Sequence, residues 1–362
     1  MTGYVARGLG AMPRGWRWTA VAGGLLVAVA LPWFVYPPVA LDMIAWALFA
    51  VSLDLLLGYT GLLSFGHAAF WGSSAYMAGV IAIETGVAFP VAVLGGAAAA
   101  MVLAVPIALL AVRRTGIYFA MVTLAFAQMV YFVANQWSSV TGGENGLQGI
   151  PKNLFGLDLS DPFYFYYAGL PIVLVGLAIA WRIVHSPFGR VLVTIRENPA
   201  RSRALGYPVA RYKVMIFVIS AGLSGLAGGL YAISHGFASL QEVYWTTSGK
   251  VVIMTILGGI GTLWGSVLGA ALIVQLEDYL ATSGIQLGPV SITGPGLITG
   301  LIFVVVVLLF RRGIWGTVAH LLRRRGADDV PDAEPHLSGT PAVAAERESV
   351  AAERESVAEP RA

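Results

Sequence analysis

Long apolar segments separated by short polar ones make up most of the first 310 residues of the chain. A helix that crosses a hydrocarbon core of roughly 30 Å needs about 18–20 residues at a rise of about 1.5 Å per residue. Seven segments of about this length are predicted to be transmembrane helices: 19–36, 39–57, 68–83, 89–112, 117–136, 163–183 and 213–234. The apolar segment 295–310 is predicted to be the last span.

The apolar segment 251–276 differs from these spans because glycines interrupt it at its middle. They are Gly258, Gly259, Gly261 and Gly265, and they allow a helix to break or two backbones to approach closely. We therefore predict two short helices or a re-entrant hairpin here. A similar glycine-rich interruption covers residues 58–72.

Paired broken helices in the two halves of a membrane protein typically mark a transport site. Unpaired backbone at membrane depth is tolerated only where it is buried in protein or lines a cavity. The two interrupted segments are therefore candidates for a substrate pathway. Close helix packing through glycine explains the same pattern equally well.

Composition supports the membrane assignment. Hydrophobic residues make up 57% of the chain and charged residues 11%, whereas roughly 25% of a soluble domain is charged. The absence of cysteine excludes disulfides, thiolate catalysis and cysteine metal sites. The first apolar segment has no small-residue cleavage site before the next span, so it is expected to be a retained helix rather than a signal peptide.

Basic residues predict which loops face the cytoplasm, by the positive-inside rule. They cluster at 7–17, 113–114, 182–213, 311–312 and 323–325. Acidic and turn residues instead surround Glu242 and Glu277 and fill the loop 138–162, which are expected to be external. Both termini are then cytoplasmic, with eight or ten crossings between them.

The chain divides into three predicted regions. Residues 1–18 form a cytoplasmic N-terminal segment, and residues 19–325 form the transmembrane domain, with a cytoplasmic loop at 185–212. Residues 326–362 hold nine acids and a seven-residue repeat with only valine as a larger apolar residue. This segment is expected to be a disordered, acidic, low-complexity tail, because its apolar groups cannot offset the entropy of ordering.

Motifs typical of enzymes are missing from the sequence. No G-x-x-x-x-G-K-[ST] loop is present, so the chain is not expected to bind ATP by that route or to be an enzyme. No catalytic residue, metal site or nucleic-acid contact is predicted. Asp42, Asp54, His67 and Glu84 are the ionisable groups in or near the spans, and their expected role is interhelical hydrogen bonding.

The arginine-rich loop 185–212 contains a predicted short helix, 199–205. Asn198 is a good N-cap, Pro199 suits the first helical position, and Gly206 suits the stop. A short capped helix that projects from a membrane bundle is expected to dock onto a soluble partner. A plain basic loop is the alternative.

Several motifs, in order, are similar to those of one known family. They are GYTGLLSFGHAAF at 58–70, TGGENGLQGIP at 141–151, SPFGR at 186–190, IRENPARSRALG at 195–206, RYK at 211–213 and LGGIGTLWGSVLGA at 257–270. Together they resemble the Liv-type ABC permeases for branched-chain amino acids, over roughly residues 40–310. The long loop after Thr141 favours the LivM-type member of that family.

The resemblance implies an all-α, type-II-like ABC importer permease in the bacterial inner membrane, among membrane lipid. Its expected partners are a homologous second permease subunit, two cytoplasmic ATPase subunits that hold ATP and Mg, and an extracytoplasmic substrate-binding protein. The chain itself is expected to need no cofactor. One departure is Pro199, where the family commonly has an acidic residue, and this removes a charge from the docking helix.

Two sets of candidate residues follow from the resemblance and the predicted helix. Contact with the ATPases is expected from Arg190, Arg196, Glu197, Asn198, Pro199, Arg201, Arg203, Leu205 and Gly206. The substrate pathway is expected to involve Ser64, Gly66, His67, Thr141, Gly142, Gly143, Gly258, Gly259 and Gly261.

Two other functions fit the sequence. One is a urea or short-chain amide ABC permease of the same family, which differs in cargo rather than architecture. The other, from a different class, is a passive channel built from paired half-helices.

Overall fold

The computed structural model describes residues 14–283, 285–287 and 290–292. Its helices are α1 (Arg14–Phe34), α2 (Pro37–Thr60), α3 (His67–Thr85), α4 (Phe89–Ala111), α5 (Ile117–Gln136), α6 (Ser138–Thr141), the 3-10 helix η1 (Gly143–Asn145), α7 (Pro162–Val184), α8 (Pro187–Glu197), α9 (Pro199–Ala204), α10 (Val209–His235), α11 (Leu240–Val243), α12 (Trp245–Gly258) and α13 (Leu263–Ser283). The predicted last span, 295–310, and the predicted tail, 326–362, lie outside the described residues.

Five of the described helices are long and apolar enough to cross a membrane. They are α2, α4, α5, α7 and α10. Helices α12 and α13 make a sixth span if that bent pair is counted as one. Each of the seven predicted spans corresponds to a helix. The chain is therefore an all-α polytopic membrane protein, as predicted.

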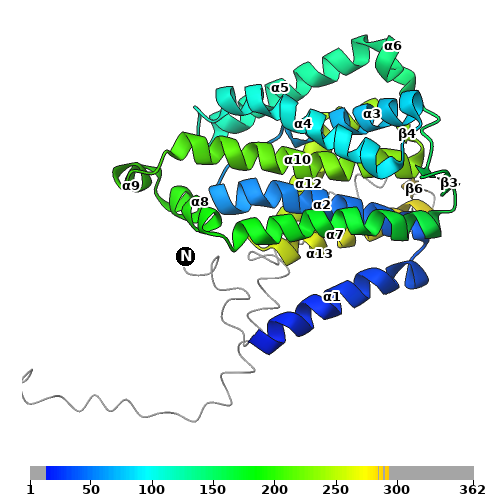
Figure 1. The fold of residues 1–362 in the computed structure, drawn as a ribbon, viewed down its shortest axis with the longest axis horizontal. Helices are drawn as coiled ribbons and strands as arrows, with labels where there is room; N and C mark the ends of the chain where they lie inside the picture. Colours follow the sequence, from blue (N-terminus) through cyan, green and yellow to red (C-terminus); the bar gives the residue numbers. More distant parts are fainter. Residues whose placement is uncertain (1–13, 284, 288–289, 293–362) are drawn as a thin grey trace, which may run out of the picture. The chain divides into compact units, whose positions relative to one another are not determined.

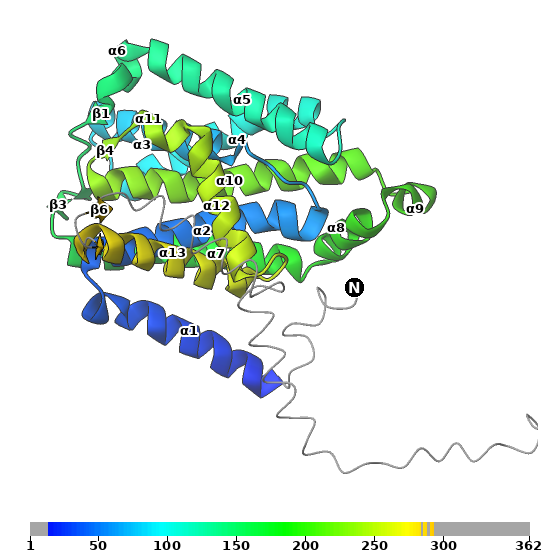
Figure 2. The same cartoon turned by 180° about the vertical axis from the view of Figure 1, so that it is seen from behind.

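Helices α2 and α10 form the core of the bundle. In the apolar 18-residue stretch of each helix, 94% of α2 and 83% of α10 is buried inside the protein, whereas only 28% of α5 and of α7 is buried. Figures 1 and 2 show α2 and α10 side by side, with α8 and α9 beyond one end and the short strands at the other. The two ends of the helices therefore carry different structures, a helical extension at one and loops with strands at the other.

Small residues allow the backbones of α3, α4 and α10 to approach one another closely. A Cβ added to Gly225 of α10 would lie 2.9 Å from the Cα of Ala97 in α4. A Cβ on Gly96 of α4 would lie 2.6 Å from the carbonyl oxygen of Ser74 in α3, and the hydroxyl of Ser74 donates to the carbonyl of Gly225 at 2.6 Å. Such small-residue packing is the usual basis of helix association in membranes, where lipid tails are as apolar as the side chains.

The α12–α13 segment is bent by 119° at residues 259–262. Gly259 and Gly261 adopt φ values of 120° and 81°, which residues with a side chain rarely adopt. Lys250 of α12 and Glu277 of α13 form an ion pair, so the two limbs fold back on each other. The prediction that 251–276 is not one straight span is confirmed, because two helices meet at a sharp bend here.

Short strands connect the loops at the end opposite α8 and α9. Strand β1 (Leu147–Gln148) pairs with β4 (Phe237–Ala238), and β2 (Asn153–Leu154) pairs with β3 (Leu157–Asp158). Strands β5 (Ile285–Leu287) and β6 (Val290–Ile292) form a third antiparallel pair. These strands are too short to give an alternating pattern in the sequence, and they were not predicted. The β1–β4 pair ties the loop after α5 to the end of α10.

We predict that Gly58→Ala destabilises the fold. A Cβ at this position in α2 would lie 2.6 Å from the Cα of Gly261, so the backbone at the α12–α13 break must move. Overpacking of this kind costs about 1–3 kcal/mol, which thermal unfolding of the purified protein will detect.

Gly249→Ala is the matched control, because nothing lies within 4 Å of a Cβ at that position in α12. It should leave the midpoint unchanged or raise it slightly, since alanine favours helix by about 1 kcal/mol over glycine. Equal midpoints for the two variants would contradict the close contact between α2 and the break.

Candidate functional site

An amphipathic helix, α8, begins the extension at one end of the bundle. The hydroxyl of Ser186 accepts a hydrogen bond from the Gly189 amide at 3.2 Å, and Pro187 occupies the first turn, where its missing N–H costs nothing. Gly189, Leu192 and Ile195 are buried, at a spacing of three residues that places them on one helical face. This segment was predicted to be part of a loop, although the Ser-Pro start and that spacing are both readable in the sequence.

The second helix of the extension, α9, has the caps that the sequence predicts. The side chain of Asn198 accepts a hydrogen bond from the Arg201 amide at 2.9 Å, and the hydroxyl of Ser202 donates to the Asn198 carbonyl at 3.1 Å. Gly206 follows the helix with φ 85°. The predicted helix 199–205 is confirmed as Pro199–Ala204, with Leu205 as its C-cap.

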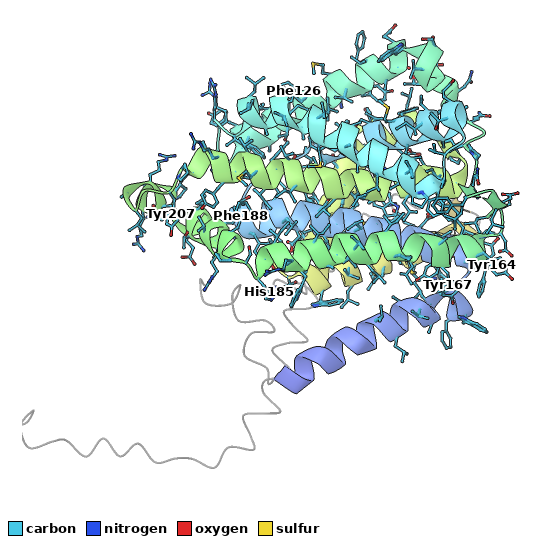
Figure 3. The ribbon with its side chains drawn as sticks, viewed as in Figure 1. Phe126, Tyr164, Tyr167, His185, Phe188 and Tyr207 are labelled. Carbon is cyan, nitrogen blue, oxygen red and sulfur yellow. The ribbon has the colours of Figure 1, made fainter. Side chains whose placement is uncertain are left out.

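Most of the predicted ATPase-contact residues are exposed on this extension. Leu205 is 69% exposed. Arg190, Glu197, Asn198, Arg201, Arg203 and Gly206 are exposed as well, and Pro199 is half-buried. Figure 3 places Phe188 and Tyr207 at this end and Tyr164 and Tyr167 at the other. The extension therefore presents basic groups and one large apolar side chain to its surroundings.

Arg196 differs from the other arginines of this set because its guanidinium contacts the bundle. It donates a hydrogen bond to the carbonyl oxygen of Gly58, near the end of α2. A Cβ on Gly61 would lie 3.2 Å from Arg196 Cγ, so the side chain lies against the turn that follows α2. The contact satisfies a carbonyl at a helix C-terminus with a cation, which is the favoured arrangement.

The same part of α2 contacts the α12–α13 break. A carboxylate oxygen of Asp54 accepts a hydrogen bond from the Gly261 amide at 2.7 Å, and Asp54 is fully buried. Gly58 lies directly against Gly261. The two glycine-interrupted segments therefore meet, and α8 is connected to the break through one turn of α2.

His67, at the start of α3, belongs to a buried polar network. Its Nε2 lies 2.8 Å from the hydroxyl of Ser220 in α10, and that hydroxyl donates to the carbonyl oxygen of Ser52. Because the Ser220 hydrogen is used on Ser52, Nε2 of His67 must be the donor to Ser220. The Nδ1 atom is left without a hydrogen-bond partner among the described residues.

Ser64 and Gly66 shape the turn between α2 and α3. The Ser64 hydroxyl accepts from the Gly66 amide at 3.2 Å, and the Phe65 amide donates to the hydroxyl of Thr123 in α5, also at 3.2 Å. The amide of Ala68, in the first turn of α3, donates to the hydroxyl of Ser248 in α12 at 2.8 Å. These bonds satisfy non-helical backbone of the turn with groups from α5 and α12.

Thr141, Gly142 and Gly143 lie elsewhere. The Thr141 hydroxyl donates to the carbonyl of Ala134 at 2.6 Å and accepts from the Gly143 amide at 3.2 Å, in a turn that closes the far end of α5. Thr123, which contacts the α2–α3 turn, is 11 residues before Ala134, or roughly 16 Å along the helix. The structure therefore separates this group from Ser64, Gly66, His67, Gly258, Gly259 and Gly261.

Glu242, in α11 outside the spans, is buried beside the loops at the same far end. Burial raises the pKa of this carboxyl to about 7, although the amide and hydroxyl of Ser239 both donate to its Oε1 at 3.3 Å and oppose the change. Its Oε2 has no hydrogen-bond partner in the described part of the chain. The fold therefore favours the protonated form of Glu242.

Comparison with known proteins identifies the family. Residues 38–310 match the family model described as branched-chain amino acid transport system / permease component. The chain belongs to this permease family. The match covers every described helix from α3 to α13 and nearly all of α2.

The permease is similar to named subunits of two kinds of transporter. It is 30% identical over 299 residues to the high-affinity branched-chain amino acid transport system permease protein LivM of Salmonella typhimurium, which covers 73% of this chain and 69% of that protein. LivM of Escherichia coli matches with the same identity and coverage. The autoinducer 2 import system permease protein LsrC of Klebsiella pneumoniae is 32% identical over 151 residues, 39% of this chain and 42% of LsrC. No solved structure matches the chain significantly.

Several polar residues of the permease core were not among the predicted site residues. Ser52, Ser220 and Ser248 are completely buried, and each contacts a glycine-interrupted segment or a residue bonded to one. A readable signal existed for α10, where Ser220 and Ser224 stand four residues apart on a glycine-rich face. Nothing in the sequence links these serines to His67, because their contacts span more than 150 residues.

We predict that the thermal stability of the permease falls as the pH rises from about 4.5 to about 7 and levels off above that. The folded pKa of Glu242 is raised above its ordinary 4.5, so its contribution is complete below pH 4.5 and is lost as the pH passes through about 7. Between pH 5.5 and 8 the midpoint should drop, on the order of a few degrees.

Glu242→Gln should remove most of this drop, because the amide cannot ionise. Glu144→Gln, at an exposed acid in the same set of loops, is the control and should leave the drop unchanged. A Glu242→Gln profile that follows the parent protein would show that another group causes the pH dependence.

Proposed function

We propose that the chain is a subunit of an ABC importer that moves branched-chain or related hydrophobic amino acids into the cell across the inner membrane. ATP and Mg are held by two cytoplasmic ATPase subunits, and a homologous second permease completes the membrane part. An extracytoplasmic binding protein delivers the cargo. The similarity to two LivM proteins over 73% of the chain supports this assignment.

The observation that carries the proposal is the contact chain from the exposed extension to the break. Exposed Arg201 and Leu205 lie on α9, while Arg196 of the preceding helix is bonded to Gly58. One turn earlier in α2, Asp54 holds the Gly261 amide. A partner that pushes on α8 and α9 therefore acts on a helix that directly supports the α12–α13 break.

Charge supports the orientation. The extension end carries Arg113 and Arg114 between α4 and α5 in addition to the arginines of α8 and α9. The opposite end carries Glu144, Asp158 and Asp161. By the positive-inside rule the extension is cytoplasmic, where ATPase subunits reside, and the strand-bearing loops are external.

The membrane mechanism follows from these contacts. Binding of ATP closes the partner subunits, and α8 and α9 move with them. Because α2 is joined to the hairpin at Asp54 and Gly58, this motion alters the packing around Gly258, Gly259 and Gly261 and around His67. Access then alternates between the two sides, and no covalent chemistry takes place in this chain.

A second cargo class is favoured by one observation. LsrC of Klebsiella pneumoniae, named as an autoinducer 2 import permease, is 32% identical over 151 residues. Members that share this part of the fold therefore include a permease named for a cargo other than an amino acid. The urea and short-chain amide reading of the sequence belongs to the same group of alternatives.

The function is tested by uptake of labelled L-leucine into proteoliposomes that contain the chain with its co-purified subunits and external binding protein. We expect uptake that requires ATP in the lumen of the proteoliposomes and stops when that ATP is omitted. Urea serves as the comparator cargo. Uptake of urea but not of leucine would make urea the cargo, and flux of either compound without ATP would favour a passive channel.

We predict that Arg201→Glu combined with Arg203→Glu uncouples transport. Both side chains are exposed on α9, and reversing their charge opposes an acidic docking surface on the ATPase, so uptake should fall by about tenfold or more. The thermal midpoint of the isolated chain should stay within about 1 °C, because exposed charges contribute little to stability.

Arg113→Glu with Arg114→Glu is the matched control, since these arginines are exposed at the same end but outside α8 and α9. It should retain most of the uptake. A comparable loss in the control would indicate that general positive charge, rather than docking of α9, matters at this face.

A further inference from the structure

A mixed charged and aromatic cluster lies at the end of the bundle opposite α8 and α9, and it includes the Lys250–Glu277 ion pair of the hairpin. It is formed by Asp42 of α2, His235 of α10, Lys250 of α12 and Glu277 of α13. Between 26% and 30% of each of these side chains is exposed in the isolated chain. Four helices contribute one group each, and these include the central pair and both limbs of the hairpin.

The hydrogen bonds of His235 leave two acceptors facing each other. Its Nδ1 lies 3.0 Å from the carbonyl oxygen of Tyr231 and 3.1 Å from the hydroxyl of Ser234, and that hydroxyl donates its own hydrogen to Tyr231 at 2.7 Å, so Nδ1 carries the hydrogen. In the neutral ring Nε2 is then an acceptor, and it lies 3.5 Å from Oδ1 of Asp42. That oxygen is buried and has no hydrogen-bond donor among the described residues. One more donor, either a ring proton or a group from a ligand, would satisfy both atoms.

Lys250 supplies a positive charge beside an aromatic wall. Its ammonium group pairs with Glu277 and lies 4.2 Å from the ring centroid of Trp46. Trp46 in turn packs 5.1 Å from Trp71 and 6.3 Å from Tyr231, measured between ring centroids. The cluster thus combines carboxylates, an ammonium group and apolar rings within a few side-chain lengths.

We propose that Asp42, His235, Lys250 and Glu277 bind the charged head group of an α-amino acid. The ligand's ammonium group donates to Asp42 and Glu277, and its carboxylate accepts from Lys250. The proposal rests on the function proposed above and specifies the cargo as zwitterionic. A neutral amide or polyol has no charges to offer these partly desolvated groups, so it gains less from them.

The experiment measures ligand-induced thermal stabilisation of the complete transporter in lipid nanodiscs, with the binding protein left out. A ligand that binds the native state raises the midpoint in proportion to its affinity. The probes are L-leucine, leucinamide, which keeps only the ammonium charge, and 4-methylpentanoate, which keeps only the carboxylate. We expect L-leucine to bind most tightly.

The variants separate the two charges. Asp42→Asn should weaken the binding of leucinamide about tenfold and leave the binding of 4-methylpentanoate nearly unchanged. Lys250→Gln should do the reverse. Both should weaken L-leucine. A purely structural role for these residues would lower the midpoint without ligand but could not produce this crossed pattern. Glu84→Gln, at an exposed acid near the end of α3, is the control and should bind all three probes like the parent protein.

The outcomes distinguish this site from the function it rests on. ATP-dependent leucine uptake by the parent protein, together with unchanged probe affinities in both variants, would overturn the site alone. Absence of leucine uptake by the parent protein would overturn the proposed function and its zwitterionic cargo with it. The crossed pattern with leucine uptake would support both.

Discussion

One hydrogen bond, from the Gly261 amide to the carboxylate of Asp54, makes the α12–α13 hairpin possible inside a membrane protein. A helix that breaks at membrane depth exposes amides and carbonyls that lipid cannot satisfy, at a cost of several kcal/mol each. A buried carboxylate has the matching problem, because it needs donors. The Gly261 amide is satisfied by one carboxylate oxygen of Asp54, and Gly58 lies directly against Gly261.

Helix α2 connects the separate parts of the molecule because it carries a key residue in each. Asp42 lies in the charged cluster at one end, Ser52 accepts from the polar network of His67, and Gly58 accepts from Arg196 at the other end. Asp42 and Gly58 are 16 residues apart, which is roughly 24 Å along the axis. A displacement at either end is therefore transmitted along one nearly fully buried helix.

The sequence predicted the helices well and their contacts poorly. Long apolar segments have one structural solution in a bilayer, so a helix was readable at each of the seven predicted spans, and five of these helices are long and apolar enough to cross a membrane. The broken segment at Gly258 to Gly261 and the caps of α9 were also readable. Helix α8 was missed because it is amphipathic, with a polar face that resembles a loop. The pairs Asp54 with Gly261 and His67 with Ser220 join residues more than 150 positions apart, and no local pattern encodes them.

The glycines between α3, α4 and α10 have a mechanical consequence. Where Gly225 meets Ala97 and Gly96 meets Ser74, backbone touches backbone with no side chain between them. Side chains between helices can change rotamer when the helices slide, but contacts between backbones have no such freedom. These three helices should move as one stiff body, so compliance is left to the outer helices and to the glycine hinge at 259–262. The permease is then expected to change shape mainly by motion at residues 259–262, while α3, α4 and α10 keep their relative positions.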